Sequence, residues 1–212
     1  MEDGRLKRFE THSHTTYSNI RLIDSINKPK ELIKTAYEKG YSGIAFTDHE
    51  FVGNMIDVLD SEKELKESGA IPQDFKIALG NEIYLTENRD VKSIEKYFHF
   101  LLIAKDTKGH EGLRKLSSNS WYNAYKDKGM WRVPTTKQEL SDLMQEYKGH
   151  IIADTACFMR GTKIKTLEGE KNIEDITDKD FVLNKDGQWE QVNYPTSRYY
   201  SGEGREITFF EN

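Results

Sequence analysis

The stretch YSGIAFTDH, residues 41–49, decides the fold, because it is a short apolar run that ends in an acidic residue and a histidine. A run of this length between polar residues is typical of a buried strand. It follows the segment from Pro29 to Lys39, which begins with a proline, places its apolar side chains on one helical face and is followed by Gly40. The sequence therefore predicts a helix and then a strand with polar side chains at its end.

The same alternation continues on both sides of this stretch. In chain order, the sequence predicts a strand at 8–14, a helix at 54–66, strands at 76–85 and 97–104, helices at 110–125 and 137–147, and a strand at 150–156. The 97–104 segment is nearly all apolar, so it is expected to be buried on both faces. Strands that alternate with helices predict a parallel α/β domain.

The pattern changes after Ala156. Residues 163–167 alternate polar and apolar side chains, and the segments 181–183 and 189–192 flank Asp186 and Gly187, a strong hairpin signal. Another strand is expected at 205–210. The segment 157–212 therefore reads as β-hairpins that follow an α/β domain.

Composition limits the classes of function that are open to the chain. Its formal net charge is −5, whereas sequence-independent DNA binding normally needs a basic surface. No window is apolar enough to span a membrane, and the N-terminus does not resemble a secretory signal. The single cysteine fits a reducing compartment. We therefore expect a cytoplasmic protein with no membrane partner.

Histidines and carboxylates follow or interrupt several of the predicted strands. His12 and His14 form an HxH pair, and residues i and i+2 of a strand point the same way. His49 follows a strand, Glu82 lies near the end of another, and His99 is the lone polar residue in an apolar run. Taken singly, the pair could be ordinary turn chemistry and His99 a core histidine bonded to backbone. Together, nitrogen and carboxylate ligands suit zinc, manganese or iron, which could activate water for phosphoester cleavage.

These residues also carry a family resemblance. THSHTTYS, AFTDHE, GNEIYL, FHFLLIAKD and HIIADTAC resemble, in order and spacing, the successive motifs of the PHP (polymerase and histidinol phosphatase) domain. The version they resemble is that of the α subunit of bacterial or phage DNA polymerase III. The resemblance covers about residues 8–157 and implies an incomplete PHP-type (β/α) barrel in residues 1–156, because the family's last motif is absent.

Carried over by position, the resemblance implies a set of metal ligands and one supporting residue. The ligands implied for a divalent metal, zinc or manganese, are His12, His14, Asp24, His49, Glu82 and His99. Asp24 matches the family carboxylate after a small insertion, SNIRLID. Asp48 matches the residue that orients His49, although a helix N-cap is its alternative role. DNA would be contacted only through a complete polymerase.

The sequence from Cys157 onward resembles a different family. CFMRGTKIKT, residues 157–166, resembles the first block of an intein, and the resemblance continues to residue 212 as an N-terminal, Hint-type all-β fragment. In that family the thiol of the first cysteine attacks the preceding carbonyl, here that of Ala156, and converts the peptide bond to a thioester. The TxxH motif and the terminal His-Asn pair of a complete intein do not appear.

Three hypotheses about the whole chain remain open. In the first, residues 1–156 are a polymerase N-extein and residues 157–212 an N-intein, which splices through Cys157 with a C-terminal polymerase and intein half encoded elsewhere. In the second, the chain is an autonomous metal-dependent phosphoesterase or 3′–5′ exonuclease, and the tail completes its fold. In the third, it is a truncated, inactive gene product. Cys157 itself could also be an inert buried thiol, or a PHP ligand followed by an unusual insertion.

Overall fold

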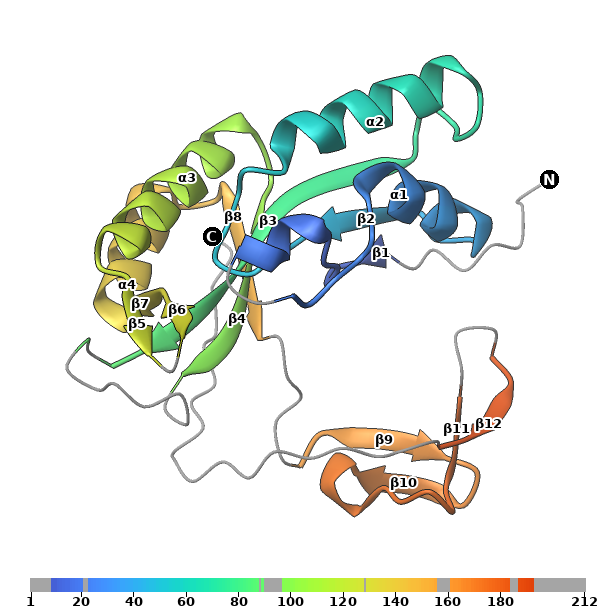
Figure 1. The fold of residues 1–212 in the computed structure, drawn as a ribbon. Helices are drawn as coiled ribbons and strands as arrows, with labels where there is room; N and C mark the ends of the chain where they lie inside the picture. The colour runs from blue at the N-terminus through green and yellow to red at the C-terminus, as the bar shows by residue number, and fades with distance from the viewer. Residues whose placement is uncertain are drawn as a thin grey trace. The chain divides into compact units, whose positions relative to one another are not determined.

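The computed structural model describes residues 9–20, 23–87, 89, 97–127, 129–155, 161–183 and 187–192. Contacts between residues divide the chain into two units, Met1–Ala156 and Cys157–Asn212. Figure 1 shows the elements of each unit. Ala156, Cys157 and the strand expected at 205–210 lie outside the described residues.

The first unit is a curled sheet with helices packed against it (Figure 1). Its strand order is β1-β2-β3-β4-β8, and β7 also pairs with β3. The strands are β1 (Phe9–Glu10), β2 (Gly43–Phe46), β3 (Lys76–Thr86), β4 (Phe98–Ala104), β7 (Pro134–Thr136) and β8 (Ile151–Thr155), with a separate hairpin of β5 (Tyr125–Asp127) and β6 (Met130–Arg132). The expected strand at 8–14 is thus only two residues long.

The sheet is mixed, which corrects the prediction of a parallel domain. The pairs β1–β2, β2–β3 and β3–β7 are parallel, but β4 runs antiparallel to both β3 and β8. Residues 87–97 join β3 to β4, and a parallel crossover needs about a dozen residues or more, usually with a helix. The connection is just short of that length, which favours an antiparallel return. As a result, the start of β4 lies beside the end of β3.

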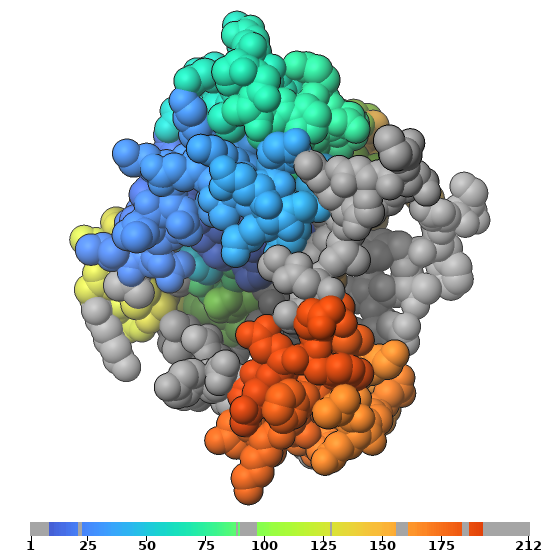
Figure 2. Space-filling model, turned by 90° about the vertical axis from the view of Figure 1, so that its right-hand side faces the viewer, coloured from blue at the N-terminus to red at the C-terminus, as the bar shows by residue number. Residues whose placement is uncertain are grey.

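The helices divide the apolar residues between two cores. The helices are α1 (Pro29–Glu38), α2 (Met55–Glu67), α3 (Thr107–Tyr122) and α4 (Lys137–Glu146), with a short 3-10 helix, η1 (Thr16–Ile20). One core lies among α1, α2 and β2 and includes Ile33, Phe46 and Val58. Figure 2 shows the outer face of α1 and α2, which cover this core. The other lies among α3, α4, β3 and β4 and includes Leu102 and Leu113. None of the helices in the described parts of the chain has the length and apolar character that a membrane crossing requires.

Local interactions fix where the helices begin. The side chain of Asp106 accepts a hydrogen bond from the backbone N–H of Gly109 and caps α3, so the helix starts at Thr107 rather than at the expected His110. Only glycine fits at position 109, because a Cβ there would lie 2.1 Å from the carbonyl oxygen of His150. The helix ends at Tyr122 instead of 125, where the β5–β6 hairpin begins.

The second unit is a small antiparallel sheet with the order β10-β9-β11-β12. Its elements are β9 (Lys163–Thr166), β10 (Gly169–Asn172), a 3-10 turn η3 (Ile173–Asp175), β11 (Phe181–Leu183) and β12 (Trp189–Gln191). The hairpin expected around Gly187 forms, with Val182 opposite Glu190. Among residues 161–183 and 187–192, the buried side chains are Thr166 and Asp180, and no apolar residue is buried.

Candidate metal centre

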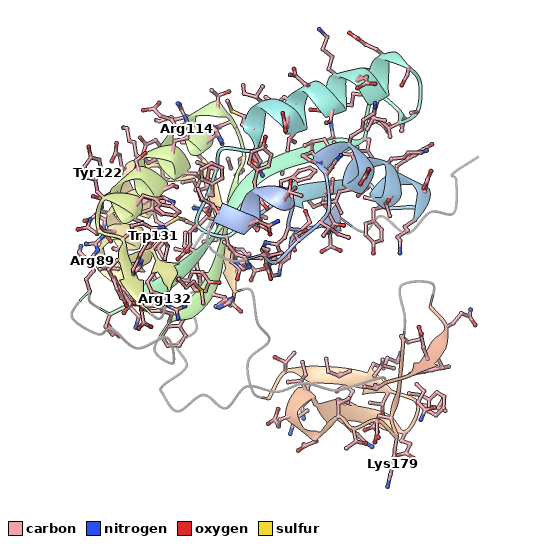
Figure 3. All side chains as sticks on the ribbon, viewed as in Figure 1. Arg89, Arg114, Tyr122, Trp131, Arg132 and Lys179 are labelled. Carbon is pink, nitrogen blue, oxygen red and sulfur yellow. The ribbon has the colours of Figure 1, made fainter. Side chains whose placement is uncertain are left out.

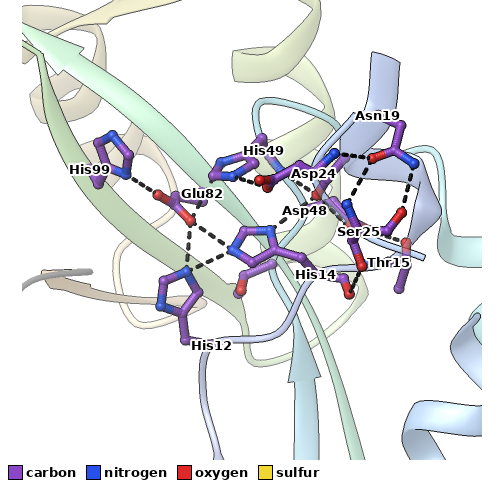
Figure 4. Close-up of polar contacts among 12 residues, drawn as sticks. His12, His14, Thr15, Asn19, Asp24, Ser25, Asp48, His49, Glu82 and His99 are labelled. Atoms are coloured by element: carbon purple, nitrogen blue, oxygen red, sulfur yellow. Dashed lines mark hydrogen bonds and ion pairs between the residues drawn. The ribbon is translucent and has the colours of Figure 1, made fainter. Parts of the chain in front are cut away.

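Glu82 lies at the middle of a cluster of four imidazoles (Figure 4). It is near the middle of β3 and is 1% exposed. Its Oε2 lies 2.7 Å from His12 Nε2, 3.1 Å from His14 Nε2 and 3.5 Å from His49 Nδ1. Its Oε1 lies 2.5 Å from His99 Nδ1. One buried carboxylate thus lies next to histidines from the loop after β1, the segment after β2 and the start of β4.

The antiparallel direction of β4 explains how His99 reaches this cluster. His99 is the second residue of β4 and stands opposite Tyr84, two residues after Glu82 in β3. Residues i and i+2 of a strand share a face, so Glu82 and Tyr84 point the same way. From the sequence, the functional groups are expected to follow or interrupt strands of a parallel sheet. Here the start of one strand meets the end of its neighbour instead.

The HxH pair lies in the loop between β1 and η1 rather than on a strand. Even so, the Nε2 atoms of His12 and His14 are 2.9 Å apart. The intervening Ser13 anchors the loop, because its hydroxyl donates to the carbonyl of Ala45 at 2.5 Å and its N–H donates to the hydroxyl of Thr47 at 3.1 Å. The loop is therefore tied to β2, and the two imidazoles converge without a strand between them.

Asp24 completes a second group of potential ligands. Its Oδ2 lies 2.8 Å from His49 Nε2, and the carboxylate is 43% exposed. Asn19 holds the segment in place, because its side-chain oxygen accepts from the N–H groups of Asp24 and Ser25 at 2.7 and 2.9 Å. Ligand atoms lie within 4.8 Å of one another in the set His12, His14 and Glu82 and in the set His14, Asp24 and His49. The two sets share His14, so they form one continuous group of potential metal ligands.

Asp48 supports the loop around His14 rather than the ring of His49. It is fully buried and accepts four hydrogen bonds, from Thr15 N–H, Thr15 Oγ1, Ser18 Oγ and Asn54 Nδ2, at 2.5–2.7 Å. Ser18 Oγ in turn lies 3.0 Å from His14 Nδ1. Among the described residues, Asp48 makes no bond to the ring of His49. It is also not the N-cap of α2, because that position is Asn54.

Charge interactions within the cluster shift two pKa values. Burial raises the pKa of Glu82, but the close ring nitrogens of His12, His14 and His99 outweigh it and hold this pKa well below its usual range. The hydrogen bond to Glu82 raises the pKa of His12 against the opposing effect of burial. The carboxylate is therefore ionised, with four imidazole rings around it. A bound metal ion would supply positive charge to balance it.

The hydrogen bonding of Glu82 Oε1 and the types of ligand around it show whether the site suits a metal ion. Glu82 Oε1 is buried and forms no well-directed hydrogen bond within the described residues, although His99 Nδ1 lies 2.5 Å away. A buried carboxylate oxygen of this kind needs a partner. Imidazole nitrogens that converge on a shared carboxylate are suitable ligands for divalent transition metals. The residues present therefore fit a divalent metal centre, without fixing which metal binds.

Several supporting residues were not identified from the sequence. Tyr84 places its hydroxyl 3.3 Å from His49 Nδ1, and its ring packs edge-to-face on His99 at 4.4 Å between centroids. Its position two residues after Glu82 was the available signal. Thr15 and Ser18 lie inside the quoted THSHTTYS motif, but their bonds to Asp48 depend on contacts between segments about thirty positions apart.

Comparisons with known proteins agree on one family. The family model described as "PHP domain" matches residues 10–179. A DNA-directed DNA polymerase of Bacillus phage SPbeta is 44% identical over 163 residues, which cover 74% of this chain and 12% of the relative. The DNA polymerase III subunit alpha of Campylobacter jejuni is 34% identical over 163 residues, covering 76% of this chain and 11% of the relative.

A third relative extends beyond the first unit. The DNA polymerase III subunit alpha of Aquifex aeolicus is 36% identical over 191 residues, covering 81% of this chain and 15% of the relative. The chain thus spans only a small fraction of the length of the curated relatives it matches. Because the family match runs to residue 179, it does not mark a boundary at Cys157.

Proposed function

The chain belongs to the PHP domain family, and we propose that its Met1–Ala156 unit is the front part of the PHP domain of a replicative polymerase of the DNA polymerase III α type. The motifs match in order, and the relatives are polymerases. The observation that carries the proposal is the convergence of four imidazoles on the buried carboxylate of Glu82. Such a centre suits the cleavage of phosphoesters, with zinc or manganese as the favoured ions.

Each side chain has a distinct part in this proposal. Glu82, His12, His14, His49, His99 and Asp24 would hold the metal. A bound divalent metal would polarise the phosphoryl oxygen and lower the pKa of its water. Asp48 orients His14 through Ser18, and Tyr84 packs beside His49 and His99. Because the family's last ligands are missing from this chain, we expect the isolated chain to bind metal without efficient hydrolysis.

Metal titration tests this proposal. Calorimetric titration of the chain with Zn²⁺ and with Mn²⁺ should show binding. Glu82→Gln should weaken it by more than the roughly 10- to 100-fold that loss of an outer-shell partner costs. Glu67→Gln, on the exposed face of α2, is the matched control and should change nothing. Equal metal affinity in Glu82→Gln and wild type would exclude Glu82 as a metal ligand.

We further propose that residues 157–212 are the N-terminal half of an intein that splices through Cys157. The supporting observation is that the described part of the Cys157–Asn212 unit has no apolar core. Four large apolar side chains are exposed instead: Leu167, Phe181, Leu183 and Trp189. Its outer strands β10 and β12 each have an open edge within the described sheet. Such a surface fits a complementary chain that adds strands and covers the apolar side chains.

The chemistry begins at the junction of the two units. The Cys157 thiolate attacks the carbonyl carbon of Ala156. The carbon–sulfur bond forms, the carbon–nitrogen bond breaks, and the released amine of Cys157 takes up a proton. A nucleophile at the start of the returning polymerase sequence would then accept the acyl group. If that nucleophile is a cysteine, the spliced product would regain the cysteine that the PHP family has at this position.

Ligation in trans tests the intein proposal. The chain is mixed with a polypeptide that carries the remaining intein, ending in His-Asn, followed by Cys and polymerase sequence. Mass spectrometry should show a product joined at Ala156 and a released intein. Cys157→Ala should abolish ligation while metal binding persists.

The two alternatives give different results in the same preparation. An autonomous phosphoesterase, which the family match to residue 179 favours, predicts metal-dependent hydrolysis of bis(p-nitrophenyl) phosphate by the isolated chain and no ligation. A truncated gene product predicts neither activity, and an open reading frame that continues into the intein in the flanking DNA.

A further inference from the structure

Arg132 is a buried cation with weak partners. It ends β6 in the β5–β6 hairpin and is 5% exposed. Its guanidinium lies 3.5 Å from Asp127 Oδ2 and 3.4 Å from Met130 Sδ, both long contacts. Its Nε is buried and has no hydrogen-bond partner in the described part of the chain. Removing a guanidinium from water is costly unless it is fully paired, so this residue needs an explanation that the fold does not give.

One tyrosine pairs with Arg132 across the hairpin, and its hydroxyl bonds to that of a second tyrosine. Tyr125 stands directly opposite Arg132 in the hairpin. Its hydroxyl lies 2.5 Å from that of Tyr97. The hairpin and the Tyr97–Tyr125 bond therefore bring one guanidinium and two phenol hydroxyls, which are hydrogen-bond donors, into the same part of the unit. Asp127 is the carboxylate that pairs with the guanidinium.

The cluster adjoins the metal centre through Tyr84. The ring of Tyr97 lies 6.4 Å from that of Tyr84, measured between centroids. Tyr84 in turn lies 4.4 Å from His99 and 5.7 Å from His49 on the same measure. Tyr97 also precedes His99 by two residues. This series of aromatic contacts connects the hairpin that carries Arg132 to the metal ligands. Figure 3 shows Arg132 on the hairpin and Arg114 on the separate surface of α3.

We propose that Arg132, with the hydroxyls of Tyr97 and Tyr125, forms an anion subsite that binds a phosphate group of the substrate next to the metal centre. The substrate class, a phosphoester of a nucleotide, rests on the proposed function. The subsite itself rests on the buried guanidinium and its neighbours. Arginine presents a planar set of donors that matches the oxygens of phosphate, and a largely desolvated site strengthens such bonds.

Substitution by methionine separates a binding role from a structural one. Arg132→Met keeps most of the side-chain volume and removes the charge. A poorly paired buried cation can often be replaced by an apolar residue without loss of stability. We therefore expect Arg132→Met to unfold at the same temperature as wild type or higher. If Arg132 is instead a structural residue, the unfolding temperature should fall.

Calorimetric titration of the full chain with inorganic phosphate and with thymidine 5′-monophosphate, with and without Mn²⁺, measures the binding role. Arg132→Met should weaken the binding of both probes by about 10- to 100-fold, as expected for lost bonds between charged groups. Tyr97→Phe should weaken it less. Mn²⁺ affinity should be unchanged in both variants. Arg114→Met, which removes an exposed arginine from α3, should behave as wild type.

The outcomes distinguish this proposal from the metal-centre proposal. Wild-type affinity for phosphate in Arg132→Met, or no phosphate binding by wild type, would overturn the subsite. Acetate binding as tightly as phosphate would also overturn it, because the site would then select charge alone. If wild type binds no Mn²⁺ yet its phosphate binding depends on Arg132, the subsite is supported and the metal-centre proposal fails.

Discussion

The Met1–Ala156 unit and the Cys157–Asn212 unit are both built on β-sheets, but the first buries its large apolar side chains and the second leaves them exposed. The first buries two clusters beneath four helices, including fully buried Leu102 and Phe46. In the second, the described strands leave Phe181 and Trp189 39–40% exposed and bury no apolar residue. Apolar burial is the main favourable term in folding. The first unit therefore has the means to fold alone, whereas the second is expected to need another chain.

Truncating one large apolar side chain in each unit should give the largest difference in unfolding free energy. Leu102→Ala removes a side chain that is 0% exposed in the first unit and should cost about 2–5 kcal/mol of unfolding free energy. Trp189→Ala in the second unit should change the same quantity by no more than about 0.5 kcal/mol. Denaturant unfolding followed by circular dichroism measures both. A large loss in Trp189→Ala would show that the second unit has a core of its own.

The exposed apolar side chains of the second unit should matter when its partner is present. Trp189→Ala should lower the affinity for the complementary intein half by about 2 kcal/mol, because buried tryptophans are frequent hot spots of interfaces. Lys179→Ala, an exposed position of the same unit, is the control. Surface plasmon resonance with Cys157→Ala chains avoids splicing during the measurement. Equal affinity in the two variants would place the interface elsewhere.

A capping box in the first unit predicts a smaller effect. Thr136 Oγ1 accepts from the N–H of Glu139, and Glu139 Oε2 accepts from the N–H of Thr136 at 2.8 Å. Thr136→Ala should cost about 1 kcal/mol of unfolding free energy. Urea unfolding at neutral pH measures it. A loss confined to the second unit would contradict the division of the chain.

The same box gives the first unit a dependence on pH. Burial raises the pKa of Glu139, but hydrogen bonds from Arg89 and Thr136 outweigh it and lower this pKa below its ordinary value. A carboxyl whose pKa is lower in the folded state stabilises the fold above its unfolded pKa, and that contribution is lost as the pH falls through the folded pKa. Glu139→Gln should therefore reduce the loss of stability below about pH 4.5. Urea unfolding from pH 3 to 7 would show it, and parallel curves for variant and wild type would contradict it.

Most elements and the metal candidates could be predicted from local pattern. The periodic segments gave helices and strands close to those observed, and His12, His14, His49, Glu82 and His99 lie together in the structure. The direction of β4 was predicted wrongly, because strand direction depends on how a strand is connected and paired and not on its own residues. Local sequence pattern therefore predicts helices and strands, whereas the direction in which two strands pair depends on contacts that the pattern does not contain.

The contacts that support the metal ligands could not be predicted from the local sequence pattern. Asp48 was expected to orient His49, but its carboxylate is taken up by donors from Thr15, Ser18 and Asn54, which surround it only after the chain folds. Arg132 lies in a segment without a recognisable motif. It is connected to Tyr97 only through Tyr125, which pairs with it in the β5–β6 hairpin. Such roles depend on contacts between distant segments, which a single sequence does not display.

The smallest expected effect tests whether the two units respond separately. Asp180 Oδ2 accepts from the N–H and hydroxyl of Thr177 at 2.8 and 3.0 Å, and its other oxygen pairs with Lys171. The bond to Lys171 and that to the Thr177 backbone lower the pKa of Asp180. Asp180→Asn keeps the shape of the side chain and removes its charge. Amide exchange should therefore quicken around residues 177–182, and less so at high salt because ions screen the pair. The amides of β3 should exchange at unchanged rates; if they also quicken, the units are coupled and the contrast in burial would not reflect independent folding.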